Sequence, residues 1–196
     1  FNGSETFTVS VEDAEYTDSQ IITVTVNAVN DAPVLEAVSD QNMNEGGTKV
    51  LLLSASDVDE DELTYSITDG TNILPSIDGS TVTFSIIDDD WNGSESFTAT
   101  VEDAEYSESQ TFTVTVDNVN DAPVLATVSD VLYDEDGTTT LDLSASDVDE
   151  DVLTFSILGG TYITATLVDS QVTFTSETNF NGSETFTVSV EDAEYT

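Results

Sequence analysis

The chain repeats itself with a period of about 90 residues, and this repeat constrains its fold more than any other feature. The sequence Asn-Asp-Ala-Pro-Val-Leu begins at Asn30 and again at Asn120, and SASDVDED occurs at 54–61 and at 144–151. Residues 1–17 are identical to residues 180–196. A period of this length matches one small domain with its own core, so the sequence predicts tandem modules.

The Asn-Asp-Ala-Pro segments mark the predicted module boundaries. They delimit one complete module at 33–122, the C-terminal strands of a preceding module at 1–32, and a following module at 123–196 that lacks its last strand. Since Phe1 opens in the middle of the pattern, we interpret the chain as a window of a longer protein. If the polypeptide ends at Thr196, the last module exposes a strand edge where residues 18–29 of a neighbouring copy could dock.

The strand pattern predicts an all-β fold. "TFTVSV" places Phe7, Val9 and Val11 on one face and hydroxyl residues on the other, and "VTFSI" at 82–86 and "LTYSI" at 63–67 alternate in the same way. No helical periodicity accompanies these runs. About seven short strands in each module, with one apolar face, are typical of an antiparallel β-sandwich.

Composition excludes several classes of function. Among 196 residues there are 41 Asp and Glu but one basic side chain, Lys49, and the net charge is −40. Nucleic acid is therefore excluded as a partner, because phosphate binding needs Lys and Arg. The chain has no Cys for disulfides or zinc–thiolate sites, and no apolar run long enough for membrane insertion. Hydrophobic residues still make up 38%, which is enough to expect a folded core.

The repeated acidic run predicts a cation site. Asp57, Asp59 and Asp61 alternate along an extended chain, so their carboxylates point to one side. Two such charges about 6 Å apart repel by roughly 3 kcal/mol at an effective dielectric near 20. Calcium accepts six to eight oxygen ligands in loose geometry and would relieve this repulsion. The second copy of the run contains Asp147, Asp149 and Asp151.

The acidic run has two other interpretations, an EF-hand and a solvated surface. An EF-hand does not fit, because its glycine and final glutamate positions are occupied by Glu62 and Thr68. A merely solvated acidic face remains open as the alternative.

Three motifs carry a family resemblance. "LSASDVDEDELTYSI" resembles the cadherin run in which a D-x-D loop leads into a strand, and "VNDAPVL" resembles the cadherin linker. With "FNGSETFTVSVEDAEY" they are similar to bacterial cadherin-like tandem repeats of the tandem-95 type, found in large surface and secreted proteins. The resemblance implies cadherin-like or Ig-like Greek-key β-sandwiches in an end-to-end array, with calcium at the junctions between modules.

Matched position by position, the resemblance implies two sets of calcium ligands. The first junction takes Asn30, Asp31, Asp57, Asp59 and Asp103. The second takes Asn120, Asp121, Asp147, Asp149 and Asp192, together with Glu45, Asp88 and Asp90 from the module before it.

These features predict a structural protein. There is no His, Cys or Arg, so Ser and Thr have no ordinary activating base, and we expect no enzymatic activity. We expect a calcium-stabilised spacer or fibre shaft of an extracellular bacterial adhesin or surface filament, with neighbouring modules or other copies in a fibre as partners. The alternative is a β-sandwich module that binds a polysaccharide or cell-surface ligand, which exposed aromatic pairs would favour.

Overall fold

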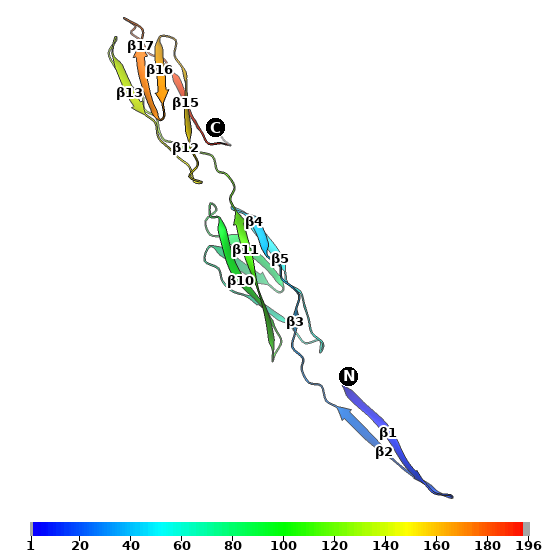
Figure 1. The fold of residues 1–196 in the computed structure, drawn as a ribbon. Coiled ribbons are helices and arrows are strands. Elements are labelled where there is room, and N and C mark those ends of the chain that lie inside the picture. Colours follow the sequence, from blue (N-terminus) through cyan, green and yellow to red (C-terminus); the bar gives the residue numbers. More distant parts are fainter. Residues whose placement is uncertain (1, 194–196) are drawn as a thin grey trace. The chain divides into compact units, whose positions relative to one another are not determined.

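The computed structural model describes residues 2–193, and these residues form β-strands without any helix (Figure 1). This confirms the predicted all-β class. The chain divides into two compact units, unit 1 (Phe1–Asp117) and unit 2 (Asn118–Thr196). Each unit is described by itself below.

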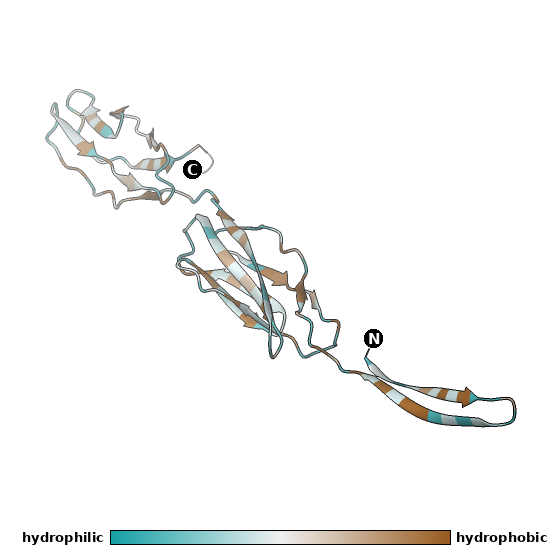
Figure 2. Ribbon diagram, turned by 60° about the horizontal axis from the view of Figure 1, so that its bottom comes forward, coloured by the Kyte–Doolittle hydropathy of each residue, from teal (hydrophilic) through white to brown (hydrophobic). Residues whose placement is uncertain are grey.

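Unit 1 begins with a two-stranded hairpin. Strands β1 (Gly3–Glu12) and β2 (Thr17–Val26) pair antiparallel, with Phe7 opposite Ile22. The predicted alternation of apolar and polar side chains is present along both strands (Figure 2). Every residue of the two strands is nevertheless exposed, and the apolar face of the hairpin is not part of the core of unit 1.

The remainder of unit 1 is a β-sandwich. One sheet has the strand order β4-β11-β10-β7, and the other has the order β5-β9-β8, while β3 pairs with β6. All pairs are antiparallel except β4–β11, which is parallel. The strands are β3 (Val34–Leu35), β4 (Gln41–Asn44), β5 (Thr48–Leu52), β6 (Ala55–Ser56), β7 (Thr64–Ile67), β8 (Ile73–Asp78), β9 (Thr81–Ile86), β10 (Gly93–Glu102) and β11 (Ser107–Asp117).

Three phenylalanines from facing strands form the centre of this sandwich. The ring of Phe84 on β9 lies 5.2 Å from that of Phe97 on β10 and 6.1 Å from that of Phe112 on β11, in edge-to-face contacts. All three side chains are buried, as the period-two pattern predicts. Trp91 packs against the same core.

Unit 2 repeats this plan in part. Its sheets have the orders β13-β17-β16 and β15-β18, and β12 pairs with β14. Its core contains an edge-to-face pair of Phe174 and Phe186, with ring centroids 5.2 Å apart, and buried Val172. The strands are β12 (Val124–Leu125), β13 (Thr138–Asp142), β14 (Ala145–Ser146), β15 (Thr154–Gly159), β16 (Ile163–Val168), β17 (Gln171–Ser176) and β18 (Phe186–Glu191).

Candidate metal centre

The first acidic run folds into a tight loop directly after β6. Asp57 Oδ1 accepts the backbone N–H of Asp59 at 2.8 Å and that of Asp61 at 3.4 Å. Between them, Glu60 adopts a left-handed conformation with φ 62°, which L-residues rarely take outside turns. The loop brings carboxylate oxygens of Asp57, Asp59 and Asp61 within 4.8 Å of one another.

Two distant segments join this loop. The Asp31 backbone N–H donates to Asp59 Oδ2 at 2.8 Å, and Asn30 Nδ2 donates to Asp103 Oδ2 at 3.1 Å. Asp103 begins the turn between β10 and β11, where its Oδ1 accepts the N–H groups of the two residues at 105 and 106. Unit 1 thus gathers the linker, the acidic loop and the strand turn into one cluster, which we call cluster A: Asn30, Asp31, Asp57, Asp59, Asp61 and Asp103.

The charges of cluster A are unevenly stabilised. Hydrogen bonds from the N–H groups of Tyr106 and Glu105 lower the pKa of Asp103. Desolvation, followed by repulsion from Asp57, raises the pKa of Asp61. The chain's single basic side chain, Lys49, lies in β5 and not in the acidic loop.

One oxygen of cluster A has no protein partner. Asp57 Oδ1 is occupied by the loop N–H groups, whereas Asp57 Oδ2 is buried and receives no hydrogen bond. A buried carboxylate oxygen without a donor is unfavourable unless a cation meets it. Three converging carboxylates with such an oxygen form a donor set suited to a hard, oxygen-preferring ion such as calcium.

Unit 2 contains an equivalent group, cluster B. Asp121 N–H donates to Asp149 Oδ2 at 2.7 Å, and Asp149 N–H donates to Asp147 Oδ1 at 3.0 Å. Desolvation and then Asp147 raise the pKa of Asp151, and Asp147 Oδ2 is again buried without a hydrogen bond. Its members are Asn120, Asp121, Asp147, Asp149, Asp151 and Asp192, whose side chain accepts a hydrogen bond from Asn120 Nδ2 at 3.0 Å.

Three residues of unit 1, Glu45, Asp88 and Asp90, are expected at the second junction and are not members of cluster A. The Glu45 N–H donates to the Asp117 carbonyl at 3.0 Å, and Asp88 and Asp90 form the turn before Trp91. Asp117 ends β11, whereas Asp103 precedes its first residue, and an 11-residue strand spans roughly 35 Å. Glu45 therefore cannot share an ion with Asp57 in unit 1.

Sequence reasoning missed one carboxylate that holds each module together. Glu95 accepts the backbone N–H groups of Thr71, Asn72 and Ile73 at 2.8–3.2 Å. Burial alone would raise the pKa of Glu95, but these hydrogen bonds lower it overall. The signal was available, because the motif "NGSE" recurs in each module.

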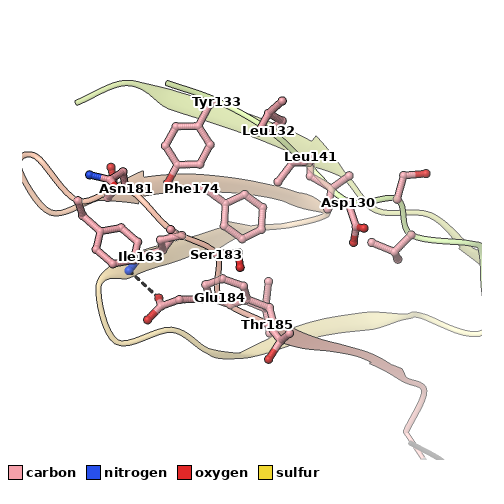
Figure 3. Close-up of a pocket in the computed structure, with 18 of the residues that line it drawn as sticks. Asp130, Leu132, Tyr133, Leu141, Ile163, Phe174, Asn181, Ser183, Glu184 and Thr185 are labelled. Carbon is pink, nitrogen blue, oxygen red and sulfur yellow. Dashed lines mark hydrogen bonds between the residues drawn. The ribbon is translucent and has the colours of Figure 1, made fainter. Parts of the chain in front are cut away.

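Its counterpart in unit 2 behaves in the same way. Glu184 accepts the N–H groups of Thr161, Tyr162 and Ile163 at 2.8–3.1 Å. The bond from Ile163 is drawn in Figure 3. Burial opposes these bonds, yet the pKa of Glu184 is lowered overall.

The family model described as "Bacterial Ig domain" matches residues 30–117 and 120–196. The chain belongs to the bacterial Ig domain family. Both matches begin near the Asn-Asp-Ala-Pro linker, so each bacterial Ig domain of the chain includes one acidic cluster. Domains of the bacterial Ig and cadherin-like type are typically extracellular and non-enzymatic.

Solved structures similar to these bacterial Ig domains include cadherin repeats. Human protocadherin-24 EC1-2 is 18% identical with a TM-score of 0.56, and the alignment covers 83% of this chain and 88% of that one. Protocadherin gamma B7 EC1–4 is 16% identical with a TM-score of 0.52, over 97% and 57% of the two chains. These likenesses show a cadherin-like fold and confirm the predicted tandem repeat.

Two further searches gave negative results. No curated protein sequence matches the chain significantly. Within residues 2–193 the structure has no helix that could cross a membrane.

Proposed function

We propose that the chain is a calcium-stabilised spacer segment of a long extracellular bacterial adhesin or surface filament. The observation that carries the proposal is the buried, unpartnered Oδ2 of Asp57 and of Asp147, each in a loop of three converging carboxylates. The two tandem bacterial Ig domains support the structural role, since each contributes the same cluster to a repeated unit.

Calcium would act on the loops and linkers of each unit. In each unit the three aspartates of the acidic loop would hold the ion, and the remaining members of the cluster would surround it. The loop aspartates are Asp57, Asp59 and Asp61 in unit 1 and Asp147, Asp149 and Asp151 in unit 2. The surrounding residues are Asn30, Asp31 and Asp103 in unit 1 and Asn120, Asp121 and Asp192 in unit 2. The ion supplies positive charge that removes the repulsion between carboxylates. Because Asp31 is already bound to Asp59, neutralising the loop also stabilises the linker. The assignment of Glu45, Asp88 and Asp90 to a calcium site at a module junction remains a prediction.

Calorimetric titration of the metal-free chain with calcium tests the proposal. We expect two sites of similar affinity per chain, with dissociation constants of about 10⁻⁴ to 10⁻³ M, as for extracellular modules. Asp57→Asn should abolish one site and Asp147→Asn the other. Asp78→Asn removes the same charge at an exposed position outside both clusters and should leave binding unchanged. Absence of calcium heat in the wild type, or equal loss in Asp78→Asn, would contradict the proposal.

The affinity should also depend on pH. A raised pKa means that Asp61 and Asp151 retain a proton at higher pH than an ordinary aspartate. Protons therefore compete with calcium, and affinity should fall in mild acid before ordinary surface aspartates titrate. Titrations at neutral and mildly acidic pH measure this shift.

A polysaccharide-binding module is the second candidate, and one observation favours it. Tyr162 stacks on Phe180 with ring centroids 5.0 Å apart and an interplanar angle of 16°, and half of the Tyr162 side chain is exposed. Exposed aromatic faces are common in sites for sugars. A glycan array probed with the wild type and Tyr162→Ala, with and without calcium, distinguishes the candidates, because only a sugar site requires Tyr162.

A further inference from the structure

Strand β16 is an edge strand of the three-stranded sheet β13-β17-β16 (Figure 1). In the described part of unit 2 it pairs with β17 alone. Strand β8 of unit 1 has the same position in the sheet β5-β9-β8, so this edge is a feature of both units. An edge strand presents unpaired backbone groups, and another chain can pair with them unless something blocks the edge.

The pairing register shows which backbone groups of β16 are free. The carbonyl of Tyr162, directly before β16, accepts the N–H of Glu177, directly after β17, at 2.8 Å. Along an antiparallel strand, alternate residues direct their N–H and C=O groups to opposite sides. The even-numbered residues of β16 therefore bond to β17. Ala165 and Leu167 direct their N–H and C=O groups to the free edge.

The same edge is blocked in unit 1. There Pro75 occupies the position of Ala165 and has no N–H to donate. Proline within a sheet is confined to edge positions whose N–H would face away from the neighbouring strand, which agrees with the register of β16. Asp78 also places a carboxylate at the end of β8, where β16 has Val168. Strand β16 carries neither of these two features.

Charge also distinguishes β16 from most of the chain. Because the net charge is −40, most surfaces of two copies repel each other. Residues 161–168 contain no charged side chain, and the strand itself, ITATLV, consists of β-branched and apolar residues. The carboxylates that flank the strand are at its two ends, on Glu184 and Asp169. A second copy of this strand therefore adds no carboxylate to the centre of a contact.

We propose that β16 pairs antiparallel with β16 of a second copy of this chain, around a two-fold axis at Thr166. The free backbone groups of Ala165 in each copy then meet those of Leu167 in the other copy, so each copy donates two hydrogen bonds and accepts two. The two three-stranded sheets become one continuous sheet. The same surface is used by both copies, so the contact is isologous and closes at two chains. It does not depend on calcium and goes beyond the function proposed above.

The pairing adds side-chain contacts on both faces of the sheet. On the outer face, Thr166 lies opposite the same residue of the second copy, in a pair with Cα atoms about 4.5 Å apart, and such cross-strand threonine pairs are stabilising. On the core face, the half-buried Ala165 and Leu167 are neighbours across the contact. The ladder is short, so we expect a reversible dimer.

Light scattering coupled to size-exclusion chromatography of the 196-residue chain tests the proposal. The mass should rise from one chain to two with protein concentration and go no higher. The dimer fraction should increase with salt, because screening weakens the repulsion between two acidic chains. Ala165→Pro introduces the proline of unit 1, removes an outward N–H without touching the ladder with β17, and should keep the chain monomeric. Ala165→Ser retains the N–H and should dimerise like the wild type.

Two charge variants test the position of the two-fold axis. Thr166→Asp should weaken the dimer, because it places two carboxylates directly opposite each other, and Thr166→Lys should do the same with two ammonium groups. An equimolar mixture of the two variants should dimerise at a lower concentration than either variant alone, and native mass spectrometry should identify the mixed dimer. The control Thr138→Asp changes the outer face of β13, at the other edge of the sheet, and should dimerise like the wild type.

Amide exchange measured residue by residue by NMR then locates the contact. The Leu167 N–H should exchange about tenfold more slowly in the dimer than in the monomer, while the amides of β17 stay protected in Ala165→Pro and show that unit 2 is folded. A wild-type chain that is monomeric at every concentration, a dimer that persists in Ala165→Pro, or a mass above two chains would each overturn the proposal. If Ala165→Pro unfolds unit 2, the charge variants decide, since unchanged dimerisation of Thr166→Asp would equally overturn it.

Discussion

Unit 1 and unit 2 are built from repeats of one sequence pattern, yet the apolar side chains of that pattern are buried to different degrees in the two units. In unit 1, three phenylalanine rings meet between the sheets, whereas in unit 2 the pair Phe174 and Phe186 forms the aromatic centre. The third ring of unit 1 is Phe112 of β11. The two acidic clusters, by contrast, have nearly the same hydrogen bonds in both units. The comparison shows that the acidic loop and its contacts with the linker form alike in both units, whereas the core of unit 1 also includes Phe112 of β11.

Strand formation at one equivalent segment also differs between the described residues of the two units. In unit 1, Gln41–Asn44 forms β4 because Val114–Asp117 of β11 pairs with it. The aligned residues 131–134 of unit 2 form no strand, and Leu132 is 96% exposed. A strand such as β11 therefore stabilises the fold in two ways. Its side chains fill the core, and its backbone groups pair with a neighbouring segment, which then forms a strand.

The largest expected difference between the units concerns their aromatic cores. Phe84→Ala should destabilise unit 1 by about 3–5 kcal/mol, because it leaves a cavity in a closed core. The equivalent Phe174→Ala should destabilise unit 2 by less, because Phe174 has one ring contact among the described residues whereas Phe84 has two. Fluorescence of Trp91, the only tryptophan, follows unfolding of unit 1, and native-state hydrogen exchange of β17 follows unit 2. Equal losses of stability in both units would contradict the comparison.

A smaller effect is expected at the half-buried carboxylates Glu95 and Glu184. Glu95→Gln should destabilise unit 1 by about 1–3 kcal/mol at neutral pH, because the amide accepts fewer of the three N–H groups. Since folding lowers the pKa of Glu95, its contribution is complete above the unfolded value of about 4.3 and is lost as pH falls through the lower folded value. Denaturation curves of wild type and variant should therefore converge in acid.

The same substitution in unit 2 sharpens this test. Glu184→Gln should act in the same direction, because its three N–H partners are equivalent. If Glu184→Gln had no effect on hydrogen exchange of β16, the stabilising effect of this carboxylate would depend on the core of unit 1 and not on the loop whose N–H groups it accepts.

The smallest effect should be identical in both units. Glu60 and Glu150 have φ angles of 62° and 59°, a region that glycine adopts without strain. Glu60→Gly and Glu150→Gly should each stabilise the chain by at most about 1 kcal/mol. Glu60→Gln and Glu150→Gln serve as controls for the lost charge. Unequal shifts in denaturation midpoint between the two glycine variants would show that the loops differ.

The sequence predicts the fold well because its signals are local or repeated. Alternation of Val82 and Phe84 identified the core, and the recurrence of Asp57 at Asp147 identified the clusters. Pairing partners are less predictable: the parallel β4–β11 pair joins segments about 70 residues apart, and nothing in "QNMN" signals it. The recurring motif "NGSE" marks Glu95, but its N–H donors lie more than 20 residues earlier in the sequence, so its role could not be predicted.

The parallel pair β4–β11 determines how unit 1 responds when the chain is stretched. β4 is one of the first strands of its sandwich in the sequence, and β11 is the last. A force that stretches the chain from its two ends therefore pulls these paired strands in opposite directions along their common axis. The hydrogen bonds between Gln41–Asn44 and Val114–Asp117 are then loaded in shear and must break together, whereas a hairpin pulled at its open end unzips one bond at a time. Atomic force extension of single chains should accordingly show a single cooperative rupture of unit 1, and Met43→Pro, which removes a backbone donor from β4, should reduce its force.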